Sequence, residues 1–280
     1  MTRVALFQMT SGINPLANAE AIANAIAQAK AGGAAMLFTP EMCGLIDKDR
    51  ARGRANIRKE GEDIVLARAR AAAAEHGIWV ALGSLAIDRT GEEGADERFA
   101  NRTYVIDDKG KIVARYDKMH MFDVDLESGE RWRESSAYAP GKGAMVVETP
   151  VGRLGLAICY DLRFPALFDV LGRAGCDVIA IPAAFTVPTG AAHWHLMQRA
   201  RAVEASAWVI SAAQVGTHED GRSTYGHSLV VDPWGEVVLD MGGETAGLAF
   251  AEIDPSRTAA VRAQLPSLAN RRQVEALTAR

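Results

Sequence analysis

Residues 154–182 read LGLAICYDLRFPALFDVLGRAGCDVIAIP and contain one complete strand–helix–strand unit. The apolar run Leu154–Cys159 predicts a strand, and Pro165–Ala174 predicts a helix that begins at a proline and ends before Gly175. A second strand, Val178–Ile181, ends before Pro182, which cannot continue a strand ladder. Alternation of strands and helices at this spacing predicts a layered α/β fold.

The first half of the chain repeats this pattern. Residues 31–40, AGGAAMLFTP, match residues 174–182, AGCDVIAIP, and both segments pass from glycine through an apolar run to a proline. Trp79-Val80 likewise matches Trp208-Val209. Two expected hairpin turns, 107–110 and 232–235, each place an aspartate three residues before a glycine. These matches favour an internal duplication over a chance likeness between short αβ units.

The other elements follow from hydrophobic periodicity and from helix-capping residues. We expect further strands at Val4–Met9, Ala35–Phe38, Ile78–Leu85 and Ala207–Gln214, and hairpins formed by Arg102–Ile106 with Lys111–Tyr116 and by Ser228–Val231 with Val237–Asp240. We expect further helices at Asn14–Gly32, Glu62–His76 and roughly His193–Ser206. Polar stretches predict loops at Asp47–Gly61, Arg89–Arg98 and Leu126–Tyr138, and the tail after Pro266 is expected to be helical or extended.

Each half of the chain combines strands with helices that must pack on a sheet. We therefore expect two sheets packed face to face, with the helices on the outside. This arrangement is an α/β fold of the α-β-β-α sandwich type, with an internal pseudo-duplication. Because no linker rich in Pro, Gly or Ser separates the halves, we expect a single domain over residues 1–280.

Composition excludes several classes of protein. The chain has 280 residues, 49% of them hydrophobic, and a net charge of −4, which indicates a globular protein with no attraction for nucleic acid or anionic lipid. No apolar run reaches the length of a membrane span, and the N-terminus shows no signal-peptide pattern. Cysteine occurs three times, at Cys43, Cys159 and Cys176, which argues against a disulfide scaffold and for a reducing, cytoplasmic location.

Cys159 is the cysteine most suited to chemistry. It ends a predicted strand and precedes the helix that begins at Pro165, so a strand-to-helix turn would expose its thiol near helix N–H groups. The alternative is an inert buried cysteine, which is the usual state of a free thiol. Cys43 and Cys176 lack this setting, and we expect them to be packing residues.

A cysteine nucleophile needs a base. The six histidines match no cysteine-protease signature and no zinc-ligand spacing, so we expect His120 and His227 to be hydrogen-bonding residues near the site. Glu41 follows a predicted strand directly and has apolar neighbours, which would make it a usable acid and base. Lys118 follows the first hairpin, also has apolar neighbours in the sequence, and could stabilise both an oxyanion and a thiolate.

Three segments together resemble the nitrilase, or carbon–nitrogen hydrolase, superfamily: FTPEM (38–42), RYDKMHMFDVD (115–125) and AICYDLRFP (157–165). Later segments, from 182–214, 225–237 and 265–272, look most like the Nit branch. The resemblance implies an α-β-β-α sandwich in which Glu41 is general base and acid, Lys118 the oxyanion stabiliser and Cys159 the nucleophile. It places a second catalytic glutamate at Glu134. The chain departs from many relatives at Ala166, where they often carry glutamate, and we expect that change to affect packing or assembly.

The same resemblance implies thiol-dependent hydrolysis of a small primary amide to acid and ammonia, with no metal and no organic cofactor. The Tyr160 backbone N–H would be the second oxyanion donor. Cys-Tyr-Asp at 159–161 favours an amidase over a nitrile hydrolase, which generally reads Cys-Trp-Glu. Among small-molecule amide substrates we rank deaminated glutathione first, 2-oxoglutaramate (an omega-amidase) second and an N-carbamoyl amine third. The resemblance also implies a homodimer or higher homo-oligomer.

Two alternatives remain, a non-catalytic binding protein on the same fold and a zinc enzyme. Phe122 and Trp194 could line a substrate pocket. Arg163 could hold an anionic substrate group, but we favour its pairing with Asp161 or another carboxylate to stabilise the turn after Cys159.

Overall fold

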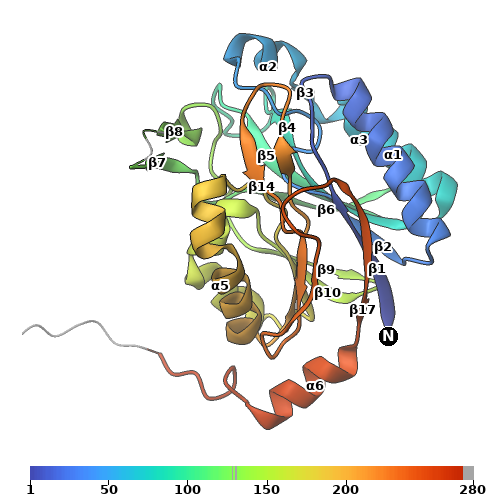
Figure 1. Ribbon diagram of the computed structural model, residues 1–280, viewed down its shortest axis with the longest axis vertical. Coiled ribbons are helices and arrows are strands. Elements are labelled where there is room, and N and C mark those ends of the chain that lie inside the picture. Colours follow the sequence, from blue (N-terminus) through green and yellow to red (C-terminus); the bar gives the residue numbers. More distant parts are fainter. Residues whose placement is uncertain (128, 130, 274–280) are drawn as a thin grey trace, which may run out of the picture.

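A computed structural model describes residues 1–127, 129 and 131–273 of the chain. The strands form two large sheets, and helices lie on the outer side of the pair, with α1 (Pro15–Ala31) and α3 (Ile64–His76) on one side and α5 (Val187–Ala205) on the other (Figure 1). The expected α-β-β-α sandwich is therefore the observed architecture. In this part of the chain no helix is both long and apolar enough to cross a membrane.

The first sheet has seven strands. Its order is β17 (Gly247–Ile253), β1 (Thr2–Gln8), β2 (Met36–Phe38), β4 (Trp79–Asp88), β5 (Ala100–Ile106) and β6 (Ile112–Asp117), with β3 (Arg58–Lys59) paired to the far end of β4. Strands β1, β2 and β4 are parallel, whereas β17 on one side and β5–β6 on the other are antiparallel.

The second sheet has six strands and repeats this topology. Its order is β9 (Met145–Thr149), β10 (Gly152–Leu156), β11 (Val178–Ala180), β12 (Trp208–Ser211), β15 (Leu229–Val231) and β16 (Val237–Asp240). Strands β10, β11 and β12 are parallel, and their flanking neighbours are antiparallel. Three central parallel strands with the same antiparallel flanks in each sheet agree with an internal duplication.

Strand alternation explains the layers. In β2, Met36 and Phe38 belong to the buried cluster that also contains Leu156 and Ala180 of the second sheet, so these side chains lie between the sheets. Leu37 points the other way and packs in the cluster formed with α1 and α3. Successive strand residues face opposite sides, so one short strand serves both cores.

Predicted helix signals match the observed ends. The Asn14 side chain accepts hydrogen bonds from the first turn of α1, and Gly32 caps its end. Gly77 ends α3 with φ +61°, a left-handed conformation that glycine adopts without strain. The remaining helices are α2 (Arg50–Asn56), α4 (Pro165–Arg173) and α6 (Pro255–Gln264), with short 3₁₀ turns η1 (Glu60–Glu62), η2 (Glu134–Ser136) and η3 (Cys159–Arg163).

Several expected boundaries were wrong. Residues 47–61 are not a plain loop, because they contain α2, and residues 126–138 contain strand β8 (Arg131–Arg133), which pairs with β7 (Asp123–Asp125). The helix expected from His193 begins at Val187, where Pro188 and Gly190 concealed its first turns. The strand expected to reach Cys159 ends at Leu156, and the cysteine opens η3. Strands β13 (Val215–Thr217) and β14 (Ser223–Tyr225) form a further small hairpin.

The two predicted hairpin turns have one geometry. Gly110 N donates to Asp107 O at 3.0 Å, and Gly235 N donates to Asp232 O at 2.9 Å. In each turn the aspartate carboxylate also accepts the amides two and four residues further on. The aspartate-to-glycine spacing in the sequence therefore reports a real structural repeat.

Candidate active site

A cavity of about 620 Å³ lies where the carboxyl ends of central strands of both sheets meet. Its lining includes the four residues expected to be catalytic, Glu41, Lys118, Glu134 and Cys159. An aromatic wall surrounds them, made of Phe99, Phe122, Trp132, Tyr138, Tyr160 and Phe185. The structure brings these four residues together on one cavity, although they are far apart in the chain.

Glu41 lies in the turn that follows β2 and is only 4% exposed. Its Oε2 accepts a hydrogen bond from the Ala184 backbone N–H at 3.0 Å. Because Ala184 follows β11 of the second sheet, this bond joins the ends of the two sheets. The carboxylate is therefore held in one orientation before any substrate binds.

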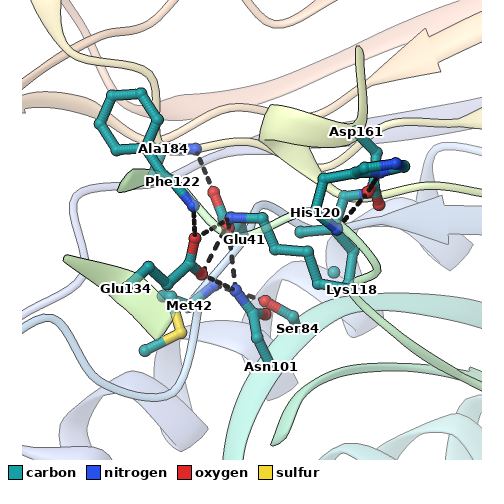
Figure 2. A network of polar contacts seen from close by, with 12 residues as sticks. Glu41, Met42, Ser84, Asn101, Lys118, His120, Phe122, Glu134, Asp161 and Ala184 are labelled. Carbon is teal, nitrogen blue, oxygen red and sulfur yellow. Dashed lines mark hydrogen bonds and ion pairs between the residues drawn. The ribbon is translucent and has the colours of Figure 1, made fainter. Parts of the chain in front are cut away.

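Lys118 follows β6 directly and joins two carboxylates. Its Nζ lies 2.9 Å from Glu41 Oε1 and 2.9 and 2.8 Å from the two carboxylate oxygens of Glu134 (Figure 2). The Phe122 backbone N–H donates to Glu134 Oε2 at 2.6 Å, so that carboxylate is fixed from a second side. Since Lys118 is 2% exposed, these three charges interact with little screening by water.

Cys159 occupies a strained turn. Its φ is +46°, a left-handed conformation that is uncommon for residues other than glycine and that concentrates at functional sites. Asp161, fully buried, holds the turn by accepting from Ile158 N at 2.9 Å and from the Tyr116 hydroxyl at 2.7 Å. His120 also bonds to Asp161, through its amide at 3.0 Å and through Nδ1 at 2.7 Å (Figure 2). The prediction that His120 is a hydrogen-bonding residue beside the site is confirmed.

The electrostatics of the site favour a neutral thiol. Burial raises the pKa of Cys159 well above its ordinary value of 9.0, and the Glu41 carboxylate raises it further, while Lys118 opposes both. Burial alone would lower the pKa of Lys118, but the carboxylates of Glu134 and Glu41 outweigh it and raise that pKa well above 10.5. The resting site therefore holds a thiol, an ammonium and carboxylates, so a base must take the thiol proton when a substrate arrives.

Cys43 and Cys176 are placed as bystanders. Both are fully buried, and burial raises the pKa of each thiol to about 12. Neither is among the residues that line the cavity.

Arg163 and Trp194 are corrections to the sequence expectations. Arg163 does not pair with Asp161, whose oxygens are already taken; its guanidinium instead lies 3.3 Å from His193 Nδ1 and over the Tyr160 ring. Trp194 is 1% exposed, donates from Nε1 to the His227 carbonyl at 2.8 Å, and is a core residue. Neither side chain lines the cavity, whereas Phe122 does, and so does Tyr160, for which only the backbone N–H was expected to take part.

His227 is a hydrogen-bonding residue, as expected, but it does not line the cavity. It lies with His195 and Asp240, and its Nδ1 is 3.0 Å from Asp240 Oδ1, while His195 Nε2 is 2.8 Å from Oδ2. Two imidazoles and a carboxylate could hold a metal ion, and sequence spacing missed this group because its members come from α5, a turn and β16. None of the three lines the cavity, so they are outside the chemistry described above.

Positioning residues of the site were missed altogether. Asn101 on β5 donates from Nδ2 to Glu41 Oε1 at 3.0 Å and to Glu134 Oε1 at 3.2 Å, so it links both acids (Figure 2). Gln214 donates to the Glu41 carbonyl at 2.9 Å and thereby fixes its backbone. The available signal was an uncharged polar residue at or next to the end of a predicted strand, since buried polar groups require a partner.

Ala166, where relatives often carry glutamate, is exposed in the first turn of α4 and does not line the cavity.

A second cavity, of about 630 Å³, surrounds Arg102, which is bound to Asp117 at 2.6 Å and to Glu92 at 2.7 Å. It holds paired charges and no nucleophile, so the first cavity is the candidate site.

Comparisons with known proteins agree with this geometry. Residues 3–263 match the model of the family described as carbon-nitrogen hydrolase. A deaminated glutathione amidase of Yersinia enterocolitica is 38% identical over 278 residues, covering 99% of this chain and 95% of the relative. The structure of the Caenorhabditis elegans NitFhit protein aligns with a TM-score of 0.86 at 36% identity, covering 97% of this chain and 65% of that one.

One further solved structure bears on the thiol. It is a variant of the amidase from Nesterenkonia sp. AN1, aligned with a TM-score of 0.77 at 27% identity over 95% of this chain and 98% of that one. In that protein acrylamide has added to the active-site cysteine. The family match over nearly the whole chain, together with the near full-length relatives, shows that this chain belongs to the carbon–nitrogen hydrolase family.

Proposed function

We propose that this chain is an amidase whose nucleophile is Cys159, with Glu41 as general base and acid and Lys118 as oxyanion stabiliser. The observation that carries the proposal is the placement of a buried thiol, a fixed carboxylate and a buried ammonium on one cavity. These are the parts that acyl transfer through a thioester requires.

The proposed reaction proceeds in two halves. Glu41 accepts the Cys159 proton as sulfur attacks the amide carbonyl, and Lys118 with the Tyr160 N–H binds the resulting oxyanion. The C–N bond then breaks while Glu41 donates its proton to the leaving nitrogen, which leaves a thioester. Water, deprotonated by Glu41 and positioned by Glu134, attacks the thioester, and the acid and the free thiol are released. No cofactor enters either half.

The proposed substrate is deaminated glutathione, as supported by the near full-length relatives that bear that name. The amides of this molecule are secondary, so its leaving group would be an amine. The ammonia expected from the sequence would be the product only with a primary amide such as 2-oxoglutaramate.

Steady-state kinetics on deaminated glutathione, 2-oxoglutaramate and an N-carbamoyl amine test the proposal. We expect the highest kcat/KM for deaminated glutathione and no turnover by Cys159→Ala. Comparably poor turnover of all three would contradict the substrate assignment. Intact activity of Cys159→Ala would exclude the thiol mechanism, and binding without any turnover would favour a non-catalytic binding protein.

The proposal extends to the whole protein. We propose that residues 1–280 act as one domain, that the protein works in the cytoplasm, and that it assembles as a homodimer or larger homo-oligomer. Three free, buried cysteines support a reducing compartment. Helix α5 exposes three large apolar side chains, Val187, Leu196 and Val203, and this exposed apolar face supports self-association.

A further inference from the structure

The cavity carries an excess of positive charge outside its reactive centre. Apart from Glu41, Lys118 and Glu134, its charged lining residues are the acids Asp47 and Glu97 and the bases Lys48, Arg50, Arg54, Arg98, Arg131, Arg133 and Arg222. The chain as a whole has a net charge of −4, so this local excess runs against its composition. Such a field attracts an anionic ligand.

Most of these cations already have a carboxylate partner. Arg98 pairs with Asp96 at 2.5 Å, Arg222 pairs with Asp220 at 2.9 Å, and Arg131 and Arg133 share Asp125. Among residues 1–127, 129 and 131–273, no carboxylate oxygen lies within 4.0 Å of Lys48, Arg50 or Arg54, and of these three cations Arg54 is the one that also stacks on an aromatic ring of the cavity. Its charge is therefore available to a ligand.

Helix α2 aims Arg54 at the cavity. The α2 residues that line it are Arg50, Gly53 and Arg54, followed by Ile57 at the end of the helix. Their spacing of three, four and seven residues puts them on one helix face. The Asp49 side chain caps the first turn by accepting from Ala51 N and Arg52 N, which fixes the helix that carries this face.

Phe99 orients the guanidinium. The Arg54 Cζ lies 5.1 Å from the centroid of the Phe99 ring, which is also part of the cavity lining. Stacking on an aromatic face leaves the edge N–H groups of a guanidinium free, and these match the two oxygens of a carboxylate. Arg54 itself is exposed, whereas Cys159 and Lys118 are buried, so the arginine lies at the solvent side of the cavity and the reactive groups lie at its base.

We propose that Arg54, supported by Phe99, binds a carboxylate of the substrate, and that the enzyme selects amides that carry a carboxylate remote from the scissile bond. This inference rests on the proposed function and deepens it, because it assigns a specificity-determining residue outside the catalytic set. Arg54 touches substrate without taking part in bond making, so its loss should weaken binding and leave the chemical step intact.

The test compares ω-carboxylate primary amides of increasing length with matched amides in which a neutral nitro group replaces the carboxylate. Kd is measured by calorimetry in the Cys159→Ala background, and kcat/KM is measured with the active thiol. We expect the best carboxylate amide to be favoured over its nitro counterpart about 10- to 100-fold in both measurements. Arg54→Gln should raise Kd and KM for the carboxylate amide to the values of the nitro amide, whose own Kd and KM stay unchanged. Arg54→Lys should retain part of the preference for the carboxylate amide.

Arg58→Gln is the matched control. Arg58 lies four residues after Arg54, is exposed and does not line the cavity, so this variant removes the same charge from outside the proposed binding site. It should leave the preference unchanged. Equal Kd and equal kcat/KM for the carboxylate and nitro amides in the parent enzyme would overturn the inference. An equal fall in affinity for both series in Arg54→Gln would overturn it as well. If the Arg54-dependent binding is present but the active thiol hydrolyses neither series nor deaminated glutathione, the proposed function fails and the binding site stands.

Discussion

At the scale of single residues, Glu41 influences the charge of the Cys159 thiol. The negative carboxylate raises the pKa of the buried thiol, so removing that charge should lower it, while Lys118 remains in place to favour the thiolate. For Glu41→Gln we therefore expect the rate of Cys159 alkylation by iodoacetamide to rise at lower pH than in the parent enzyme, because a larger thiolate fraction is present at each pH. Amide hydrolysis should be lost in the same variant, since the base is gone.

Glu97→Gln provides the control for this measurement. Glu97 also lines the cavity but is exposed, so its charge is screened by solvent and the alkylation profile should stay where it is. A Glu41→Gln profile displaced to higher pH, or not displaced, would contradict the electrostatic assignment.

The catalytic candidates could be predicted from the sequence because charged residues and a thiol are uncommon directly after an apolar strand. Cys159, Glu41 and Lys118 each follow a strand at the edge where sheet ends converge, which is visible from strand prediction alone. Asn101 and Gln214 were missed because their partners are distant in sequence. The partner of Arg163 was wrong because the lone pairs of Asp161 are used by a backbone amide, a tyrosine and a histidine, which no local pattern reveals.

At the scale of elements, a glycine sets the position of Lys118. Gly141 N donates to Lys118 O at 2.8 Å, and a Cβ at Gly141 would lie 2.1 Å from Asp117 O, a backbone atom that cannot swing aside. Gly141→Ala should therefore push the end of β6 away and displace the ammonium. Because small misplacements of catalytic groups are costly, we expect kcat/KM to fall by about 100-fold, together with a lower Tm.

Gly143→Ala is the control in the same loop, because a Cβ there meets nothing within 4 Å. Its kcat/KM should remain within a factor of about two of the parent value, because Gly143 is exposed and the added methyl group contacts no other residue. Parent-like activity in Gly141→Ala would show that the loop moves freely and that Lys118 is positioned by its carboxylates alone.

The elements that could be predicted were those with strong periodicity or clear capping residues. Helix α1 was found almost to the residue because Asn14, Pro15 and Gly32 mark its ends. Helix α2 was missed because its sequence, RARGRAN, has no apolar stripe; it depends on the Asp49 cap and on the pairing of Arg52 with Asp47 at 2.6 Å. Two of its arginines, Arg50 and Arg54, line the cavity.

At the scale of the whole molecule, the two sheets share a topology but not a chemistry. Residues 31–40 and 174–182 form equivalent strand exits, yet Pro40 is followed by Glu41 and Pro182 by Ala183. The duplication was predictable from these segments, since each repeats the same order of glycine, strand and proline. The face-to-face packing of the two sheets was predictable too, but their register against one another was not, because it depends on the packing of many side chains at once.

The exposed apolar side chains of α5 predict self-association through that helix. We expect the protein to sediment at no less than twice the 30.0 kDa mass of one chain, and Leu196→Glu to shift it towards the single-chain mass by placing a charge in an apolar contact. Leu16→Glu on α1 is the matched control, since Leu16 is also highly exposed, at 60%, but lies on the opposite side of the sandwich. A monomeric parent protein would contradict the proposed assembly.

The central claim is that Cys159 forms a thioester with the acyl part of the substrate, and intact-mass spectrometry after rapid acid quench tests it most directly. Glu134→Gln should slow the attack of water and let the acyl enzyme accumulate. We expect a mass increase equal to the substrate minus its amine or ammonia, located by peptide mapping on the fragment that contains Cys159 and absent from Cys159→Ala. Turnover without any such adduct, or an adduct on Cys43 or Cys176, would contradict it.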